Sequence, residues 1–431
     1  MVRSCLVFIA ALSLTSSFAA ELPQSSELDD VIVWATPDEQ PDGRDGYDNG
    51  RAMAIRQLRG WPKTTAEDEA RIAAALLKCL HSSNGNARND GAFALGDRNH
   101  SEVIPLIFEL GEKDPGLISI FFACYTGYRK VEPPIDLFRK GLGSKNPVTK
   151  QAILSAIRSC KAVALRTEIE ALLESDSSDD VRDDAASTLM QLGLRESAPA
   201  FRRAWASGYQ QASVIYGLTR LGNEADIAKL LPLLKSKDES LRRTVTASFS
   251  TVKLRNPKPV CDAVLGDLRD PSKTVRFQAI QTLSHFRDSR AIPQIRELVT
   301  HPAHDFSWDD RGPYVEAISA IGGREAVRLL DDMVQMDFRS YFGLEDALTR
   351  FGSPSSGRAI WKAYLKDPIR VNPAGGDVPS IGYYDARDVL AACADAELLQ
   401  YIRQRFATAS DYYEKDALAK VIGRIQARLN K

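Results

Sequence analysis

The chain has little of what most catalytic sites are built from. It holds five histidines in 431 residues, and none belongs to a His-Glu-x-x-His pattern. A Gly-rich phosphate-binding loop and a Gly-x-Ser-x-Gly turn are also missing. The sequence therefore lacks the signatures of zinc peptidases, of nucleotide-binding enzymes and of serine hydrolases. We expect a protein that is not an enzyme and that carries no cofactor.

Cysteines are few, and their spacing suggests no pairing. An odd number would remain after residue 19, which leaves at least one thiol unpaired even in an oxidising compartment. No Cys-x-x-Cys motif and no Cys/His ligand spacing occurs, so a structural zinc site is not expected. We expect free thiols that pack as small apolar side chains, with structural disulfides as the alternative. Each lies in an apolar helical stretch: Cys79, Cys124, Cys160, Cys261 and Cys393.

The first residues form an apolar run, and this run is short. Arg3 precedes the apolar stretch 5–14, and the small residues Ser17 and Ala19 follow it. This order is typical of a secretory signal peptide that is cleaved after residue 19. The stretch is too short to span a bilayer, and no later segment is long enough either. The sequence predicts a signal peptide at 1–19 and an exported protein, periplasmic or secreted, that does not span a membrane.

Neither sign of charge dominates the chain, whose formal net charge is −1. Residues 21–50 are the exception, because they carry a net charge of −8 and few apolar side chains. Such a composition buries too little surface to fold by itself, so we predict an acidic, largely extended segment at 20–64. Residues 51–431 carry a net charge of +6, with basic and acidic residues interspersed, which argues against nucleic-acid binding.

What the chain does have is an internal repeat of roughly 30 to 34 residues. The unit reads VRDDAASTLMQLGLRESAPAFRRAW from Val181 and VRFQAIQTLSHFRDSRAIPQIRELV from Val275. Pro105, Pro199 and Pro293 open the second helix of their units at intervals of 94 residues, about three periods. The pattern predicts an all-α, α-α superhelix of about ten stacked helix pairs. Over 65–431 the first helices are expected to begin near Ala87, Leu117, Val148, Val181, Gln210, Leu241, Val275, Pro313, Ser340 and Asp385.

The pattern V-R-x-x-A-x-x-x-L, followed by a turn and A-x-P, resembles the HEAT family, particularly the short HEAT-like units first named from phycobilisome lyases. Ala185 and Ala279 hold its small-residue position, where two helices approach closely. The resemblance implies a HEAT-like solenoid. It also implies a ladder of arginines that bond turn carboxylates of adjacent repeats, for example Asp180 or Asp270. Anion binding is the alternative for these arginines, which are Arg88, Arg182, Arg242 and Arg276.

The resemblance implies a binding surface rather than a reaction. The repeated His-Glu pairs of HEAT-repeat hydroxylases that bind two irons are absent. By analogy, the first helix of each unit lines the concave face, where aromatic residues beside arginines are typical interface anchors. The alternative is that these aromatics fill gaps between repeats. We predict a non-enzymatic scaffold or adaptor for a protein or peptide partner. The predicted contact residues are Phe93, Tyr216, Arg243, Phe277 and Gln281, with Asn89, Lys150, Asp183 and Ser187 at further exposed positions.

Two long insertions interrupt the late repeats, at 301–312 and 366–385. Loops of this length inside a compact repeat array are usually functional or disordered. The alternative function is therefore a metal-dependent or enzymatic module built on these two insertions. The first insertion contains a set of side chains that could hold a divalent metal: His301, His304, Asp305 and Asp309.

Overall fold

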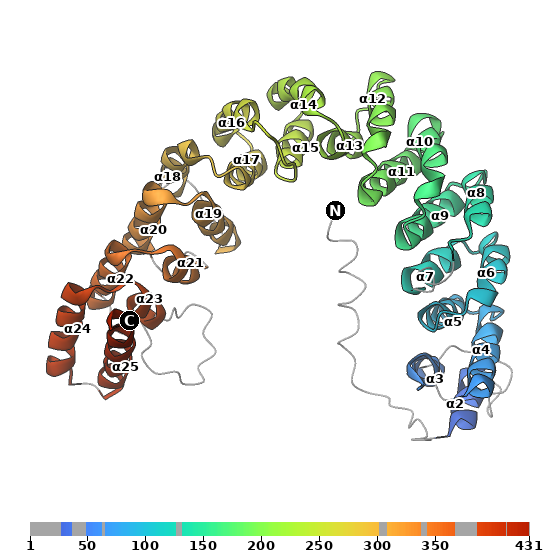
Figure 1. Cartoon of the computed structure of the whole chain (residues 1–431), viewed down its shortest axis with the longest axis horizontal. Coiled ribbons are helices and arrows are strands. Elements are labelled where there is room, and N and C mark those ends of the chain that lie inside the picture. Colours follow the sequence, from blue (N-terminus) through green and yellow to red (C-terminus); the bar gives the residue numbers. More distant parts are fainter. Residues whose placement is uncertain are drawn as a thin grey trace. The chain divides into compact units, whose positions relative to one another are not determined.

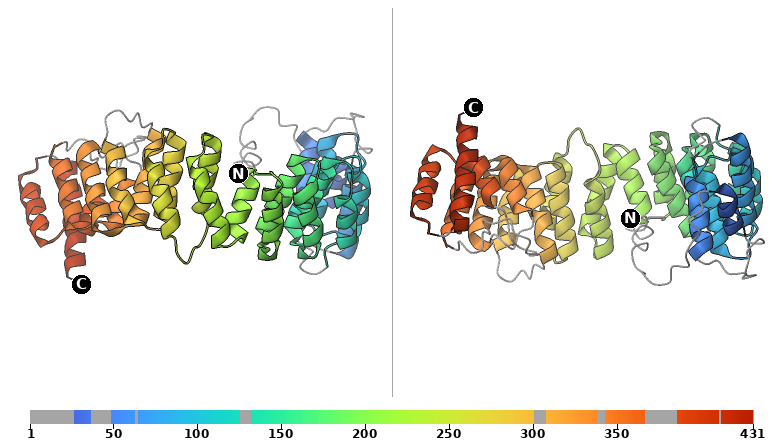
Figure 2. Two further views of the ribbon diagram at one scale, coloured as in Figure 1. Left: turned by 90° about the horizontal axis from the view of Figure 1, so that it is seen from above. Right: turned by 90° about the horizontal axis from the view of Figure 1, so that it is seen from below.

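The chain folds into helices throughout the part that the structure describes. This computed structural model describes residues 27–36, 49–62, 65–125, 132–300, 308–337, 343–366, 386–410 and 412–430. Within these ranges every element is an α-helix or a short 3-10 helix, so the predicted all-α class is confirmed. The chain divides into two compact units, Met1–Gly217 and Leu218–Lys431. Helices of each unit stand side by side, as Figure 2 shows.

Unit 1 has two layers of helices (Figure 1). In one layer, which we call the first-helix layer, neighbours pack in the order α3, α5, α7, α9, α11. The second helix of each pair packs on the outside of this layer, often after a 3-10 turn. The elements are α2 (Leu28–Ala35), α3 (Asn49–Gly60), α4 (Ala66–Leu80), α5 (Gly85–Asp97), η2 (Ser101–Val103), α6 (Ile104–Gly111), α7 (Gly116–Cys124), α8 (Ile135–Leu142), α9 (Pro147–Cys160), η4 (Val163–Leu165), α10 (Arg166–Ser175), α11 (Asp179–Leu192), η5 (Arg195–Ser197) and α12 (Ala198–Ala206).

Unit 2 repeats this arrangement. Its first-helix layer packs in the order α15, α17, α19, α21, α23, and α25 closes it. The helix α13 (Ala212–Leu221) crosses the boundary between the units. The other elements are α14 (Glu224–Leu230), η6 (Leu231–Lys235), α15 (Glu239–Phe249), α16 (Lys258–Val264), η7 (Leu265–Arg269), α17 (Lys273–His285), η8 (Ser289–Ala291), α18 (Ile292–Thr300), α19 (Trp308–Ile321), α20 (Gly323–Asp337), α21 (Leu344–Phe351), α22 (Pro354–Lys366), α23 (Ala386–Cys393), α24 (Ala396–Thr408) and α25 (Tyr412–Leu429).

The first helices begin where a polar residue caps the free backbone N–H groups of the first turn. Asn84 accepts hydrogen bonds from the N–H groups of Asn86 and Ala87, and Asp238 does the same for Ser240 and Leu241. Asn146 and Ser178 cap α9 and α11 through one bond each. From α5 to α17 the first helices therefore begin within two residues of the predicted positions.

Small residues let neighbouring helices approach closely, as the repeat pattern predicts. Ala185 and Ala279 are fully buried. Gly96 of α5 lies against α7, so a Cβ there would overlap the carbonyl oxygen of Phe121. That oxygen is backbone and cannot swing away, so the packing of α5 on α7 requires glycine at this position.

The region before residue 65 differs from the extended segment that we predict there. Where the structure describes it, this region forms α2 and α3, and α2 packs on α3 and α4. The buried guanidinium of Arg98, the residue that follows α5, binds the end of α3. Its Nη1 donates to the carbonyl oxygens of Leu58 (2.8 Å), Arg59 (3.1 Å) and Trp61 (2.9 Å). The correction has a physical reason, because α2 and α3 bury their apolar faces against the first repeats instead of folding alone.

Late in the chain, one insertion is shorter than predicted. Residues from Trp308 onward already belong to α19, which contains Pro313 rather than starting at it. The remainder of both insertions, 301–307 and 367–385, lies outside the described residues.

The five cysteines are free, as predicted. Four are buried, and Cys124 is partly exposed. Burial raises the pKa of Cys79 and Cys160 to about 12, and that of Cys124, Cys261 and Cys393 to about 11. These thiols pack as small apolar groups.

Candidate binding surfaces of the two units

A ladder of cations joins successive repeats at the starts of the first helices. Arg88 and Arg242 each donate to two carbonyl oxygens of the turn before their own helix, five and six residues earlier. Each also binds the aspartate of the following turn, Asp114 at 2.8 Å and Asp270 at 2.7 Å. Arg276 binds the carbonyl oxygens of Asp270 and Pro271. The predicted bond to a turn carboxylate of the adjacent repeat is present for Arg88 and Arg242, whereas Arg276 binds only carbonyl oxygens of the turn before its own helix.

Lys150 supplies another step of the ladder, which changes the register predicted for α9. Like Arg88 and Arg242 it is the fourth residue of its helix, and it binds Asp176 in the turn before α11. Thr149, which is buried, takes the place of the apolar residue before it, and Val148 is exposed. Lys150 is therefore a ladder residue and not a free surface position. The turn carboxylate of this step is Asp176 and not the predicted Asp180, which is exposed.

Arg182 continues the ladder through an aromatic ring. Its guanidinium carbon lies 3.5 Å from the centroid of the Tyr209 ring, and its Nε donates to the carbonyl oxygen of Leu173. The Tyr209 hydroxyl donates to Asp183 Oδ1 at 2.7 Å, and Ser213 Oγ lies 2.5 Å from the same atom. Asp183, predicted as an exposed contact position, is thus held between two repeats.

Two carboxyl groups near Arg242 have pKa values shifted in opposite directions. Burial acts to raise the pKa of Asp270, but Arg242 and the Ser272 backbone N–H outweigh it and lower that pKa. Asp267, in the same turn, is buried and has no cation in contact. Burial raises its pKa from 3.8 to about 6, although the Thr246 hydroxyl, 2.9 Å away, opposes part of the rise. A buried carboxylate therefore sits directly behind the ladder.

Three of the predicted contact residues lie on neighbouring helices of unit 2. Arg243 on α15 is exposed, and no ion pair forms between it and any described residue. Phe277 and Gln281 on α17 are half-buried and lie one helical turn apart. Arg243 and Phe277 are both the fifth residue of their helix, so the packing of α15 on α17 brings equivalent positions together.

The other two predicted contact residues lie in unit 1. Phe93 on α5 is half-buried, and the guanidinium carbon of Arg59 on α3 lies 4.1 Å from its ring centroid. One face of this ring is therefore used inside the molecule. Tyr216 on α13 is half-buried. The structure does not bring Phe93 and Tyr216 onto adjacent helices.

The predicted metal-ligand set lies outside the described side chains. His301, His304 and Asp305 fall in 301–307, and Asp309 lies in α19 with its side chain not described. Within the described residues, no group of three or more His, Cys, Asp and Glu side chains is arranged to hold a metal ion. No helix among them is both long and apolar enough to cross a membrane.

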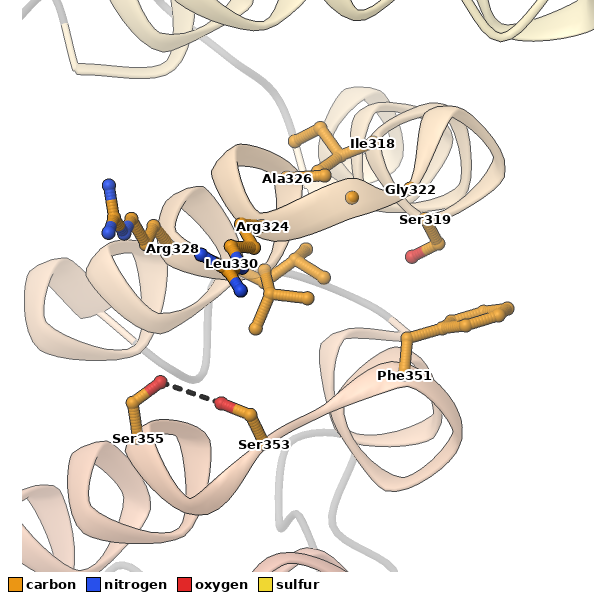
Figure 3. Close-up of a pocket in the computed structure, with 12 residues that line it drawn as sticks. Ile318, Ser319, Gly322, Arg324, Ala326, Arg328, Leu330, Phe351, Ser353 and Ser355 are labelled. Carbon is orange, nitrogen blue, oxygen red and sulfur yellow. Dashed lines mark hydrogen bonds between the residues drawn. The ribbon is translucent and has the colours of Figure 1, made fainter.

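Unit 2 also contains two hollows that the sequence reading missed. One, of about 470 Å³, lies among α19, α20, the end of α21 and the start of α22 (Figure 3). The other, of about 560 Å³, lies between α19 and α21. Ser319 and Phe351 line both, so the hollows adjoin. The sequence signal is Gly322-Gly323, whose positive φ angles of 70° and 84° make the sharp turn from α19 to α20.

Comparisons with known proteins agree with the observed architecture. Residues 227–306 match a family model described as HEAT repeats. No curated protein matches the chain. Importin beta, solved in an ammonium sulfate condition, is similar over 92% of this chain and 62% of its own, at 11% identity and a TM-score of 0.58. This likeness shows a shared solenoid fold, and it confirms the predicted HEAT-like architecture.

Two further solved structures are similar at lower TM-scores. YibA of Escherichia coli covers 72% of this chain and 98% of its own, at 16% identity and a TM-score of 0.40. Kap121p bound to Pho4p covers 99% of this chain and 57% of its own, at 12% identity and a TM-score of 0.46.

Proposed function

Because the chain is a HEAT-like repeat solenoid, we propose that it is a non-enzymatic scaffold that binds a protein partner. Contact would be made through the first-helix layer of unit 2. The observation that supports this surface is the equivalent placement of Arg243 and Phe277 on two packed helices. A cation without an ion-pair partner among the described residues and an aromatic ring occupy equivalent positions on packed helices. Arginine and aromatic side chains supply much of the binding energy at protein interfaces.

Arg243 also fits a binding role because its side chain is exposed and forms no ion pair with a described residue. Arg243 is exposed, whereas its neighbour Arg242 is bound to Asp270 and to two carbonyl oxygens. Of these two adjacent arginines, Arg242 therefore binds neighbouring turns and Arg243 faces solvent. Gln281 extends the same surface by one turn of α17 and could hydrogen-bond to a partner's backbone.

The experiment begins with affinity capture from the envelope fraction of the source cells and identification of the partner by mass spectrometry. The affinity of the purified partner is then measured for Phe277→Ala and Arg243→Ala. Each variant should lose at least about tenfold in affinity, which is about 1.4 kcal/mol. Melting temperatures should stay at the wild-type value. Unchanged affinity for both variants would reject the Arg243–Phe277 surface, and Arg403→Ala, an exposed arginine on α24, is the matched control.

We further propose that the protein is exported, on the strength of the Arg3, apolar and Ser17-Phe18-Ala19 sequence at its start. A C-terminally tagged chain should then be recovered from the periplasm or the medium with Ala20 as its first residue. N-terminal sequencing of the purified protein checks this. Recovery of the intact chain with Met1 from the cytoplasm would contradict export and would leave the binding proposal standing.

A further inference from the structure

The hollow shown in Figure 3 has an apolar wall and a cationic rim. Ile318, Val327 and Leu330 line it, and Phe351 borders it with 44% of its surface exposed. An aromatic side chain that stays this exposed at the edge of a concave apolar site is available to pack against a ligand. The space of about 470 Å³ is of the size that holds a large side chain of a bound peptide.

Two arginines supply the positive charge of the rim. Arg324 and Arg328 are four residues apart on α20, so they lie on one face of that helix. Both are exposed, and no ion pair joins either to a residue that the structure describes. Other arginines of unit 2, such as Arg242 and Arg290, do form ion pairs. Among the residues that the structure describes, no aspartate or glutamate lines this hollow.

The hydroxyl groups at the hollow are already engaged. Ser355 Oγ donates to Asp331 Oδ2 at 2.5 Å, and Ser353 Oγ lies 2.8 Å from Ser355 Oγ (Figure 3). Asp331 is buried behind the serines and does not line the hollow. The groups left to recognise a ligand are therefore the two guanidiniums, the apolar wall and the ring of Phe351.

The charge changes sign across Phe351. The adjoining hollow is lined by Glu316 and Asp346 together with Arg350, whose guanidinium carbon lies 5.9 Å from the Phe351 ring centroid. A bound segment that crosses Phe351 would thus meet two cations on one side, and two carboxylates with one cation on the other. This asymmetry favours one direction of binding.

We propose that this groove binds an acidic peptide segment of a protein partner, with an aromatic or large aliphatic residue in the hollow next to Phe351 and a carboxylate against Arg324 and Arg328. Charge complementarity selects this occupant, because carboxylates pair with arginines in a bidentate way. The site is separate from the Arg243–Phe277 surface and extends the proposed function by a second point of contact.

Binding can be measured by fluorescence anisotropy on the full chain. The probes are three short labelled peptides with a central Trp, in which the flanking residues are Asp, Asn or Lys. The Asp peptide should bind at least about tenfold more tightly than the Lys peptide at low salt. The double variant Arg324→Glu with Arg328→Glu should reverse this order, and Phe351→Ala should weaken all three peptides. Arg403→Glu and Leu365→Ala, which change exposed side chains elsewhere in unit 2, should leave the affinities as they are.

The outcomes separate this site from the Arg243 surface. Arg243→Ala should not change peptide affinity. Equal affinity of the wild type for the three peptides, or no binding of the Asp peptide, would overturn the proposal. So would an unchanged order in the Arg324→Glu, Arg328→Glu variant with a native circular dichroism spectrum. None of these results bears on the affinity of the captured partner for Phe277→Ala.

Discussion

The side chain of Arg242 on α15 meets that of Asp270, in the turn before α17, through two hydrogen bonds of 2.7 and 3.0 Å. The pair is largely shielded from solvent, with 12% of the arginine side chain and 8% of the aspartate side chain exposed. The remaining guanidinium nitrogen of Arg242 donates to the carbonyl oxygens of Ser236 and Lys237. One side chain thus holds its own turn and the turn of the next repeat together.

Arg242→Ala should lower the free energy of unfolding, because Asp270 would stay largely shielded from solvent without its cation. Urea denaturation followed by circular dichroism measures the change. Arg243→Ala removes the adjacent, exposed arginine and should change stability by less than about 0.5 kcal/mol. Similar losses for the two variants would show that the ladder contact contributes little.

Asp267 should make the protein less stable as the pH rises from 4 to 7. Its pKa in the folded state is raised from 3.8 to about 6 by burial. The stabilisation is complete below the unfolded pKa and is lost as the pH passes the folded one. This difference between the folded and unfolded pKa of Asp267 corresponds to a change of about 3 kcal/mol in the free energy of unfolding. Asp267→Asn should flatten the dependence of urea midpoint on pH in this window. Asp262→Asn, at an exposed carboxylate with a lowered pKa, should leave that slope in place.

Arg98→Met should release the end of α3 from the first repeats. The variant keeps much of the side-chain volume but cannot donate to the carbonyl oxygens of Leu58, Arg59 and Trp61. Amide hydrogen exchange in 49–60, followed by mass spectrometry, should become about tenfold faster or more. Arg56→Met, at an exposed position of α3, should keep the wild-type rate. Equal protection in both variants would mean that apolar packing alone holds α3.

Gly96→Ala should destabilise the protein by about 1 to 3 kcal/mol, since the added Cβ overlaps the backbone of Phe121. Gly423 in α25 offers the opposite test, because a Cβ there meets no atom within 4 Å. Gly423→Ala should stabilise by up to about 1 kcal/mol through its better helix propensity. Thermal unfolding of the two variants shows whether the melting temperature falls for Gly96→Ala and rises for Gly423→Ala. A higher melting temperature for Gly96→Ala would contradict the close approach of α5 and α7.

Periodicity predicted the fold well because each repeat carries its own start signals. Polar caps such as Asn84 and Asp238, the apolar-Arg pair, and the prolines of the second helices are all local, and the helices follow them. Register failed where a local signal was replaced. In α9 the buried position before the cation is occupied by Thr149. The repeat pattern predicts the more apolar Val148 beside it at that position, and Val148 is exposed.

Contacts between distant segments were harder to predict. The end of the 49–60 helix is bound by Arg98, about 40 residues away, and nothing in the acidic sequence before it reveals that partner. The Phe351 hollows are formed by α19 to α22, whose repeats depart from the regular spacing. For the predicted contact residues, the repeat pattern predicts the helix on which each lies. It does not predict what each residue binds, because that depends on surface chemistry and not on the fold.

The five cysteines of the described helices give the repeats a property beyond packing. They lie in α4, α7, α9, α16 and α23, so they sample both units. Alkylating reagents attack the thiolate, and burial holds the pKa of each thiol at about 11 to 12. Each of the four buried cysteines should therefore react only after its own helix opens, whereas Cys124 is partly exposed and should react earlier. Mass spectrometry of timed alkylation would then record the order in which the repeats come apart, with no label added to the chain.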